Sequence, residues 1–187
     1  MMQNIKPSTR PLIQFVSPNA NFLGRIIQIE SADLHQLLEE KTKIQLWEEQ
    51  EICALAIYNP WANKLLLQNI QQLKTSLSSP VIVLQDLQSD QDLYRLREID
   101  ADAVITHISV MPAAEIEALQ AKAQAMNLLL IPHIQNETDW QKIAALNPRF
   151  IFVENSFAFL QKVPNQTWLI GSQNFQGNIK LKCRLET

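Results

Sequence analysis

The sequence predicts a single α/β domain whose strands run mainly parallel, and three observations support this prediction. Short apolar runs rich in Val and Ile alternate along the chain with amphipathic segments of helical periodicity. Most of these runs are apolar at every position, which is typical of parallel strands covered on both faces. The connections between them are short, and a repeated β-α order with short connections favours either a (β/α) barrel or an open sheet. The 187 residues, 47% of them hydrophobic, are enough to bury one core.

Seven apolar runs are predicted as strands. They are Pro11–Val16, Cys53–Tyr58, Pro80–Leu84, Ala103–Thr106, Leu128–Ile131, Phe150–Val153 and Thr167–Ile170. Only thirteen residues follow Asn174, so the chain ends either with an incomplete barrel or with Ile179–Leu185 as an irregular closing strand. In the first case the open edge would be covered by a partner, because an uncovered edge strand tends to pair.

Five segments with helical periodicity lie between these strands. They are Ala32–Trp47, Ala62–Leu77, Asp90–Glu98, Ala113–Met126 and Glu137–Leu146. Ser89 with Asp92 resembles a capping box, Pro112 marks a helix start, and Asn147-Pro148 ends the last of the five. Only residues Ser156–Asn165 separate the last two predicted strands of the seven, so the sixth helix is predicted to be trimmed. The expected organisation is a polar arm at residues 1–10 and one barrel-like domain at 11–187.

Composition argues against several classes of function. The net charge is −3 with a pI near 5.6, and the charges are mixed, so no basic surface for nucleic acid is predicted. No run approaches the roughly 18 apolar residues of a membrane span, and residues 1–10 lack the apolar core of a signal peptide. Cys53 and Cys183 are far apart without metal-like spacing, so a cytoplasmic protein with reduced thiols is expected. Only three glycines are present, which leaves little material for a backbone phosphate cradle.

Several motifs occur in a consistent order. Ser79-Pro-Val-Ile-Val-Leu-Gln-Asp-Leu is followed by a helix and then by Asp100-Ala-Asp-Ala-Val-Ile. Downstream, His133-Ile-Gln precedes Asn136-Glu-Thr-Asp-Trp, and Phe152-Val-Glu-Asn-Ser follows on the next strand.

Upstream, Ile13-Gln-Phe-Val-Ser-Pro-Asn is followed by Leu23-Gly-Arg-Ile. In order and spacing the motifs resemble the indole-3-glycerol phosphate synthase family over roughly Pro11 to Asn174. The resemblance implies a TIM-barrel-like fold rather than an open sheet. That barrel would be truncated or modified, because a typical one needs about 250 residues.

The departures from this family concern the positions that carry its chemistry. By the resemblance, Gln85 stands at the position of the family's strand-three lysine, which is its general acid. His133 stands at the position of its strand-five glutamate. The remaining correspondences are Leu12 and Gln14 on strand one, Glu154 and Ser156 on strand six, and Ser172, Gln173 and Asn174 on strand seven. Ser17 and Asp86 are retained. Since amides and leucine cannot exchange protons near neutral pH, the family's ordinary activity is not expected.

Three functions follow from these residues. The first is a catalytically inactive homologue acting as a binding or protein-interaction module, with a protein partner, a second copy or a small phosphorylated ligand. The second is a repurposed enzyme, metal-dependent or not, using His107, His133 and Glu154 at the barrel mouth. The third is a carbon–carbon lyase of the tryptophan pathway with an aberrant site.

The candidate site follows from the same alignment of strands. Its catalytic candidates are His133, Glu154, Gln85 and His107, and its ligand-binding candidates are Ser17, Asn19, Ser172 and Asn174. No cofactor and no bound metal are assigned. The alternative for His107, His133 and Glu154 is that they are hydrogen-bonded polar residues without a chemical role. The broad apolar surface of Trp61–Leu77 is expected to pack on the barrel, with a contact to a second chain as the alternative.

Overall fold

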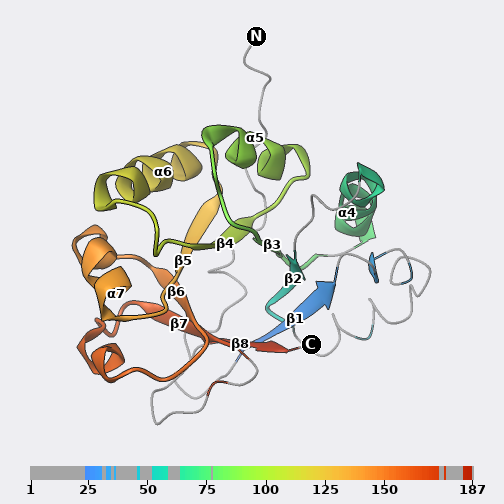
Figure 1. Cartoon of the computed structure of the whole chain (residues 1–187). Coiled ribbons are helices and arrows are strands. Elements are labelled where there is room, and N and C mark those ends of the chain that lie inside the picture. The colour runs from blue at the N-terminus through green and yellow to red at the C-terminus, as the bar shows by residue number, and fades with distance from the viewer. Residues whose placement is uncertain are drawn as a thin grey trace.

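A computed structural model describes residues 24–30, 33–34, 36, 46, 52–58, 64–76, 78–172, 175 and 183–186. Its strands form a closed parallel barrel in chain order, from β1 to β8, with helices around the outside (Figure 1). The strands are β1 (Gly24–Glu30), β2 (Ala54–Tyr58), β3 (Val81–Leu84), β4 (Ala103–His107), β5 (Leu129–His133), β6 (Phe150–Val153), β7 (Trp168–Gly171) and β8 (Cys183–Glu186). The predicted parallel α/β barrel is confirmed in a short, modified form.

The two ends of the barrel differ from the sequence-based expectation. The strand between β8 and β2 is β1, Gly24–Glu30, which the search for uniformly apolar runs missed because Arg25 and Gln28 interrupt it. The predicted first strand, Pro11–Val16, lies outside the described residues. Leu12 and Gln14 therefore gain no support as barrel-strand positions. At the other end β8 pairs with both β7 and β1, so the barrel closes.

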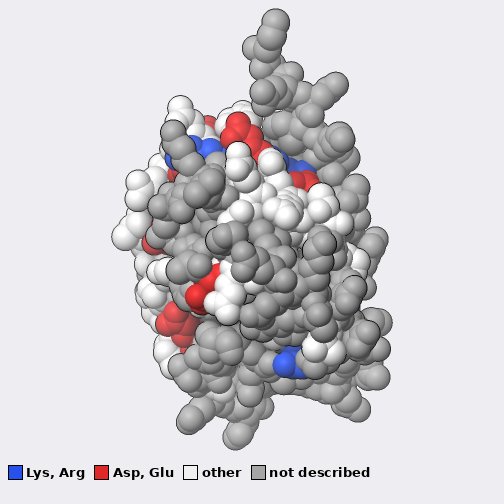
Figure 2. Space-filling view, turned by 90° about the vertical axis from the view of Figure 1, so that its right-hand side faces the viewer, with Lys and Arg blue, Asp and Glu red and all other residues white. Residues whose placement is uncertain are grey.

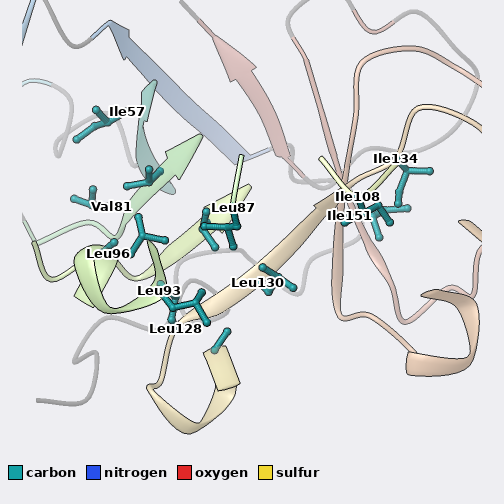
Figure 3. Packing of buried hydrophobic residues seen from close by; sticks show 14 of the residues in the cluster. Ile57, Val81, Leu87, Leu93, Leu96, Ile108, Leu128, Leu130, Ile134 and Ile151 are labelled. Atoms are coloured by element: carbon teal, nitrogen blue, oxygen red, sulfur yellow. The ribbon is translucent and has the colours of Figure 1, made fainter. Parts of the chain in front are cut away.

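Alternation along the strands produces two separate cores. One lies inside the barrel and consists of Ile26, Cys53, Ala54, Ala56, Ile82, Ala103, Ile105, Ile131, Phe150, Phe152 and Ile170. Its alanines on β2 and β4 leave volume for the phenylalanines of β6, so small and large side chains complement each other. The other core joins the outer face of the barrel to the helices, and Figure 3 shows Val81, Leu96 and Leu130 among its members.

The helices are α4 (Lys64–Ser76), α5 (Asp90–Glu98), α6 (Ala113–Ala125) and α7 (Glu137–Ile143), with short 3₁₀ turns η2 (Ala144–Leu146) and η3 (Ala158–Lys162). The predicted bounds of α5 are confirmed, and Asp92 accepts a hydrogen bond from the Ser89 N–H (3.0 Å) as a capping box requires. The helix predicted to be trimmed is η3, a single 3₁₀ segment. Helix α7 is shorter than predicted, because η2 completes it and Asn147 adopts a left-handed φ of 47°.

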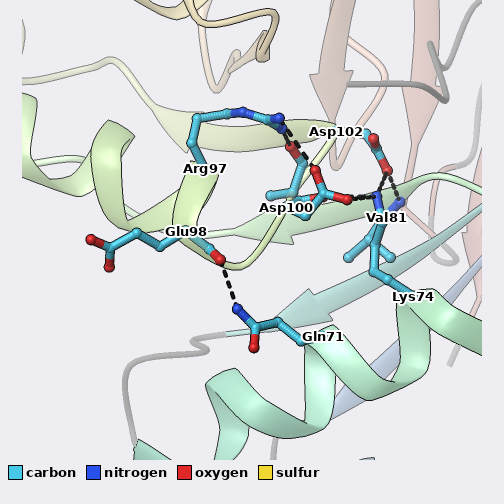
Figure 4. Close-up of polar contacts among 8 residues, drawn as sticks. Gln71, Lys74, Val81, Arg97, Glu98, Asp100 and Asp102 are labelled. Carbon is cyan, nitrogen blue, oxygen red and sulfur yellow. Dashed lines mark hydrogen bonds and ion pairs between the residues drawn. The ribbon is translucent and has the colours of Figure 1, made fainter. Parts of the chain in front are cut away.

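A polar network ties α4 to the N-terminal ends of β3 and β4 (Figure 4). The Nζ atom of Lys74 lies 2.7 Å from Oδ2 of Asp102 and donates to the Asp100 carbonyl at 2.7 Å. The same Asp102 oxygen accepts the Val81 N–H at 2.8 Å. This end of a (β/α) barrel serves stability, whereas function is found at the opposite end. The network is therefore structural.

The exposed surface carries both signs of charge. In the described part of the face drawn in Figure 2, blue and red side chains lie next to each other near its top. None of the described helices is long and apolar enough to cross a membrane. In α4, Ile70 and Leu73 are fully buried against the barrel, as the packing interpretation predicts.

Candidate site at the barrel mouth

Polar side chains continue the inward-facing positions of four neighbouring strands where these strands reach the barrel mouth. On β3 the inward positions Ile82 and Leu84 are followed by Asp86, and on β4 Ala103 and Ile105 are followed by His107. The same spacing of two leads to His133 on β5 and to Glu154 just after β6. Because alternate residues of a strand share one face, all four belong to the mouth of the barrel. We call Asp86, His107, His133 and Glu154 the mouth row.

Contacts run along the mouth row from one strand to the next. Oδ1 of Asp86 lies 2.6 Å from Nδ1 of His107 and 3.3 Å from the His107 backbone nitrogen. The rings of His107 and His133 are 4.2 Å apart between centroids and tilted by 41°. At the far end, Nε2 of His133 lies 3.7 Å from Oε1 of Glu154. The order is therefore carboxylate, imidazole, imidazole, carboxylate.

His133 is the buried member of the mouth row. Its side chain is 3% exposed, and its ring meets Phe152 edge-on at 4.8 Å between centroids. Burial, together with the neighbouring His107, lowers the pKa of His133 to about 4, against the opposing effect of Asp86 and Asp139. His133 is therefore neutral at neutral pH. Its Nε2 atom is buried and makes no hydrogen bond with the residues that the structure describes, since 3.7 Å to Glu154 is too long for one.

The loops after β4 and β5 are held together beside the mouth row by Asp139. This buried carboxylate accepts hydrogen bonds from Oγ of Ser109 (2.8 Å) and from the Gln135 backbone N–H (3.1 Å). Asn136 caps the start of α7 by accepting the Asp139 N–H at 2.9 Å. These bonds fix the chain just after His107 and just after His133.

Gln85 lies beside the mouth row but on the opposite alternation. It shares its spacing with Val81 and Val83, which belong to the outer core. Its Nε2 atom donates to the Asp86 carbonyl at 3.0 Å, and its Oε1 atom is buried without a partner among the described residues. Gln85 is thus adjacent to Asp86 at the end of β3.

The candidates from sequence divide into three groups. His107, His133 and Glu154 lie in contact, and Ser172 adjoins them by donating from Oγ to the Glu154 carbonyl at 3.0 Å. Gln85 is adjacent as described. Ser17, Asn19 and Asn174 lie outside the described residues.

Asp86 was missed as a site residue, although the sequence offered a signal for it. The period of two that runs through Ile82 and Leu84 leads directly to Asp86, whereas sequence reasoning followed the family lysine to Gln85. Within the described ranges, no group of three or more His, Cys, Asp or Glu side chains has an arrangement that could hold a metal ion. The trio is therefore not arranged there as a metal centre.

Comparison with known sequences gives a partial match. No family model matches the chain. Over 86 residues it is 26% identical to the tryptophan biosynthesis protein TrpCF of Vibrio parahaemolyticus, a match that covers 46% of this chain and 18% of that protein.

Solved structures resemble the whole fold. The 2-keto-3-deoxy-6-phospho-gluconate aldolase of Zymomonas mobilis superposes with a TM-score of 0.63 at 14% identity, over 95% of this chain and 86% of the other. The tryptophan synthase alpha chain of Legionella pneumophila gives a TM-score of 0.65 at 11% identity, over 93% and 83%. The chain thus has a TIM-barrel-like fold.

Proposed function

We propose that this chain is a barrel protein of indole-3-glycerol phosphate synthase ancestry that has lost the ring-closing reaction and binds a small molecule at its mouth. The ancestry is supported by the order of the sequence motifs and by the partial match to a tryptophan biosynthesis protein. The fold supports a ligand site at the mouth, since (β/α) barrels bind their ligands at the C-terminal ends of the strands. Descent alone does not decide activity, which depends on the residues at the mouth.

The observation that carries the proposal is the character of His133 in the mouth row, supported by that of Gln85, an amide on the opposite alternation of β3. By the resemblance, His133 stands at the position of a glutamate and Gln85 at that of the lysine that donates a proton. An amide has no proton to exchange near neutral pH, and a histidine with a pKa near 4 has neither the negative charge of a glutamate nor a proton to give. Losing one acid–base group commonly costs about 10²–10⁴ in rate, so losing both leaves no useful turnover.

The test is a turnover assay with the anthranilate-derived ribulose phosphate substrate of that family. An active indole-3-glycerol phosphate synthase at the same concentration is the positive control. We expect product formation by this chain to equal that of a blank without protein. Turnover that is lost in Glu154→Gln, but kept in Glu117→Gln on the exposed face of α6, would overturn the proposal.

A second candidate, an acid–base enzyme, is favoured by the contact between Asp86 and His107. A carboxylate 2.6 Å from Nδ1 holds the ring and its tautomer, which leaves Nε2 to take up a proton from a bound molecule. His107 is partly exposed, so a ligand at the mouth can reach it. Proton abstraction next to a carbonyl is the simplest reaction for this arrangement.

Deuterium exchange at the methyl group of pyruvate tests this second candidate. Pyruvate is chosen because structures of similar fold include 2-keto acid aldolases. Exchange catalysed by His107 should fall by about 10²-fold or more in His107→Gln, and measurably in Asp86→Asn, while Glu117→Gln keeps the original rate. Equal exchange in all four proteins would rule out His107 as the base.

A further inference from the structure

The pair formed by His133 and Glu154 lacks a hydrogen-bonded partner in the part of the chain that the structure describes. Nε2 of His133 is buried and unpartnered, and it faces a carboxylate oxygen 3.7 Å away. A donor and an acceptor facing each other would close to about 2.8 Å, whereas two acceptors keep apart. The gap fits a neutral imidazole that presents its nitrogen lone pair to the carboxylate. A third group that donates to both atoms would satisfy the pair.

The charge around the mouth row selects the kind of donor. The carboxylates of Asp86 and Glu154 stand at the two ends of the row, and among the described residues their ion-pair contacts are with imidazoles. Lys142, whose helix follows the loop after β5, donates to the backbone carbonyls of Ser109 (2.5 Å) and Ile108 (3.4 Å). Among the described residues, no Lys or Arg side chain therefore lies in ion-pair contact with either carboxylate of the row.

A ligand anion at this side of the mouth would meet two carboxylates without a compensating cation among the described residues, which is electrostatically unfavourable. A neutral hydroxyl can donate only one hydrogen bond, so it cannot satisfy both His133 and Glu154 as a donor. An ammonium group has three donors and a positive charge, and it matches one carboxylate and one imidazole lone pair.

We propose that the barrel mouth binds a small molecule through its primary ammonium group, which donates one hydrogen bond to Glu154 and one to Nε2 of His133. This inference rests on the proposed function only in taking the mouth as a ligand site. It specifies an amine where the sequence suggested a phosphorylated ligand. The bound group would also approach His107, the next ring along the row.

Imidazole ¹⁵N resonances of the full-length protein at pH 7.5 provide the test. The probes are n-propylamine hydrochloride and sodium phosphate, at matched ionic strength. We expect propylammonium to shift the Nε2 resonance of His133 in a saturable manner, with no such shift from phosphate. In Glu154→Gln the affinity should fall about tenfold, which is the loss expected for one charge-assisted hydrogen bond.

Glu117→Gln removes the same charge from an exposed position on α6 and should leave the amine affinity unchanged. Glu154 is itself exposed, so its substitution should not disturb folding, which a thermal melt verifies. A shift of His133 by phosphate, no saturable shift by propylammonium, or an equal affinity in Glu154→Gln would overturn the amine inference. The ring-closure assay contains no free amine probe, so its result decides the proposed function separately.

Discussion

Replacing Lys74 by methionine should destabilise the barrel strongly, although the residue lies far from the mouth. The side chains of Lys74 and Asp102 are 6% and 0% exposed, and their charged atoms are 2.7 Å apart. Methionine keeps the apolar length of the side chain but removes the ammonium group that lies against the buried Asp102 carboxylate. Removing one partner of a buried ion pair costs about 3–5 kcal/mol. For a chain of this size that corresponds to a fall in Tm of roughly 6–20 °C.

The assay is urea unfolding at pH 7, followed by circular dichroism, with thermal melts alongside. The double variant Lys74→Met with Asp102→Asn should lose less unfolding free energy than the two single variants lose together. The reason is that the neutral amide oxygen of the asparagine still accepts the Val81 N–H and needs no cation beside it. Lys122→Met breaks an exposed pair with Asp90 and is the matched control, with an expected loss of at most about 1 kcal/mol. If Lys74→Met cost no more than this control, the assignment of Lys74 as a structural residue would be refuted.

Three further predictions concern the mouth and its supports. Because the pKa of His133 is lowered to about 4, the folded state binds fewer protons than the unfolded state between pH 4 and 6.5, so stability falls as the pH drops through this range. This group should make the free energy of unfolding roughly 2–3 kcal/mol lower at pH 4.5 than at pH 7.5. In His133→Gln, urea unfolding at the two pH values should show a fall in unfolding free energy that is smaller by that amount. Asn136→Ala removes the cap of α7 and should cost about 1 kcal/mol in the same assay, against no change for the exposed Gln141→Ala. Phe152→Ala opens a cavity under the His133 ring and should cost about 3–5 kcal/mol, while an unchanged midpoint would contradict the packing described inside the barrel.

The strands and helices that sequence alone located well are those with one strong local signal. The runs at β3 and β6 are apolar throughout, and the start of α5 is marked by the capping box of Ser89 and Asp92, so each follows from local chemistry. Strand β1 was not predicted, because Arg25 and Gln28 interrupt its apolar pattern. Its pairing with β2 and β8 nevertheless makes it a barrel strand. Hydrogen bonding to neighbours overrides the local pattern there.

The mouth of the barrel divides in a similar way. The convergence of His107, His133 and Glu154 could be predicted because parallel strands in a barrel bring their C-terminal ends to one rim. The role of Asp86 could not be predicted from motif matching, because it depends on which side of β3 each residue faces and on the 2.6 Å contact across to β4.

By itself the sequence determined the alternation of apolar strands and amphipathic helices, the parallel α/β class and the positions of His107, His133 and Glu154 at the ends of their strands. Each of these is a property of residue type and spacing along the chain. Only the tertiary structure decided that the barrel closes through β8, that His133 is buried and neutral, and that its Nε2 faces Glu154 without a hydrogen bond. These features depend on distances between strands far apart in sequence, and burial and electrostatic environment arise only when those strands come together.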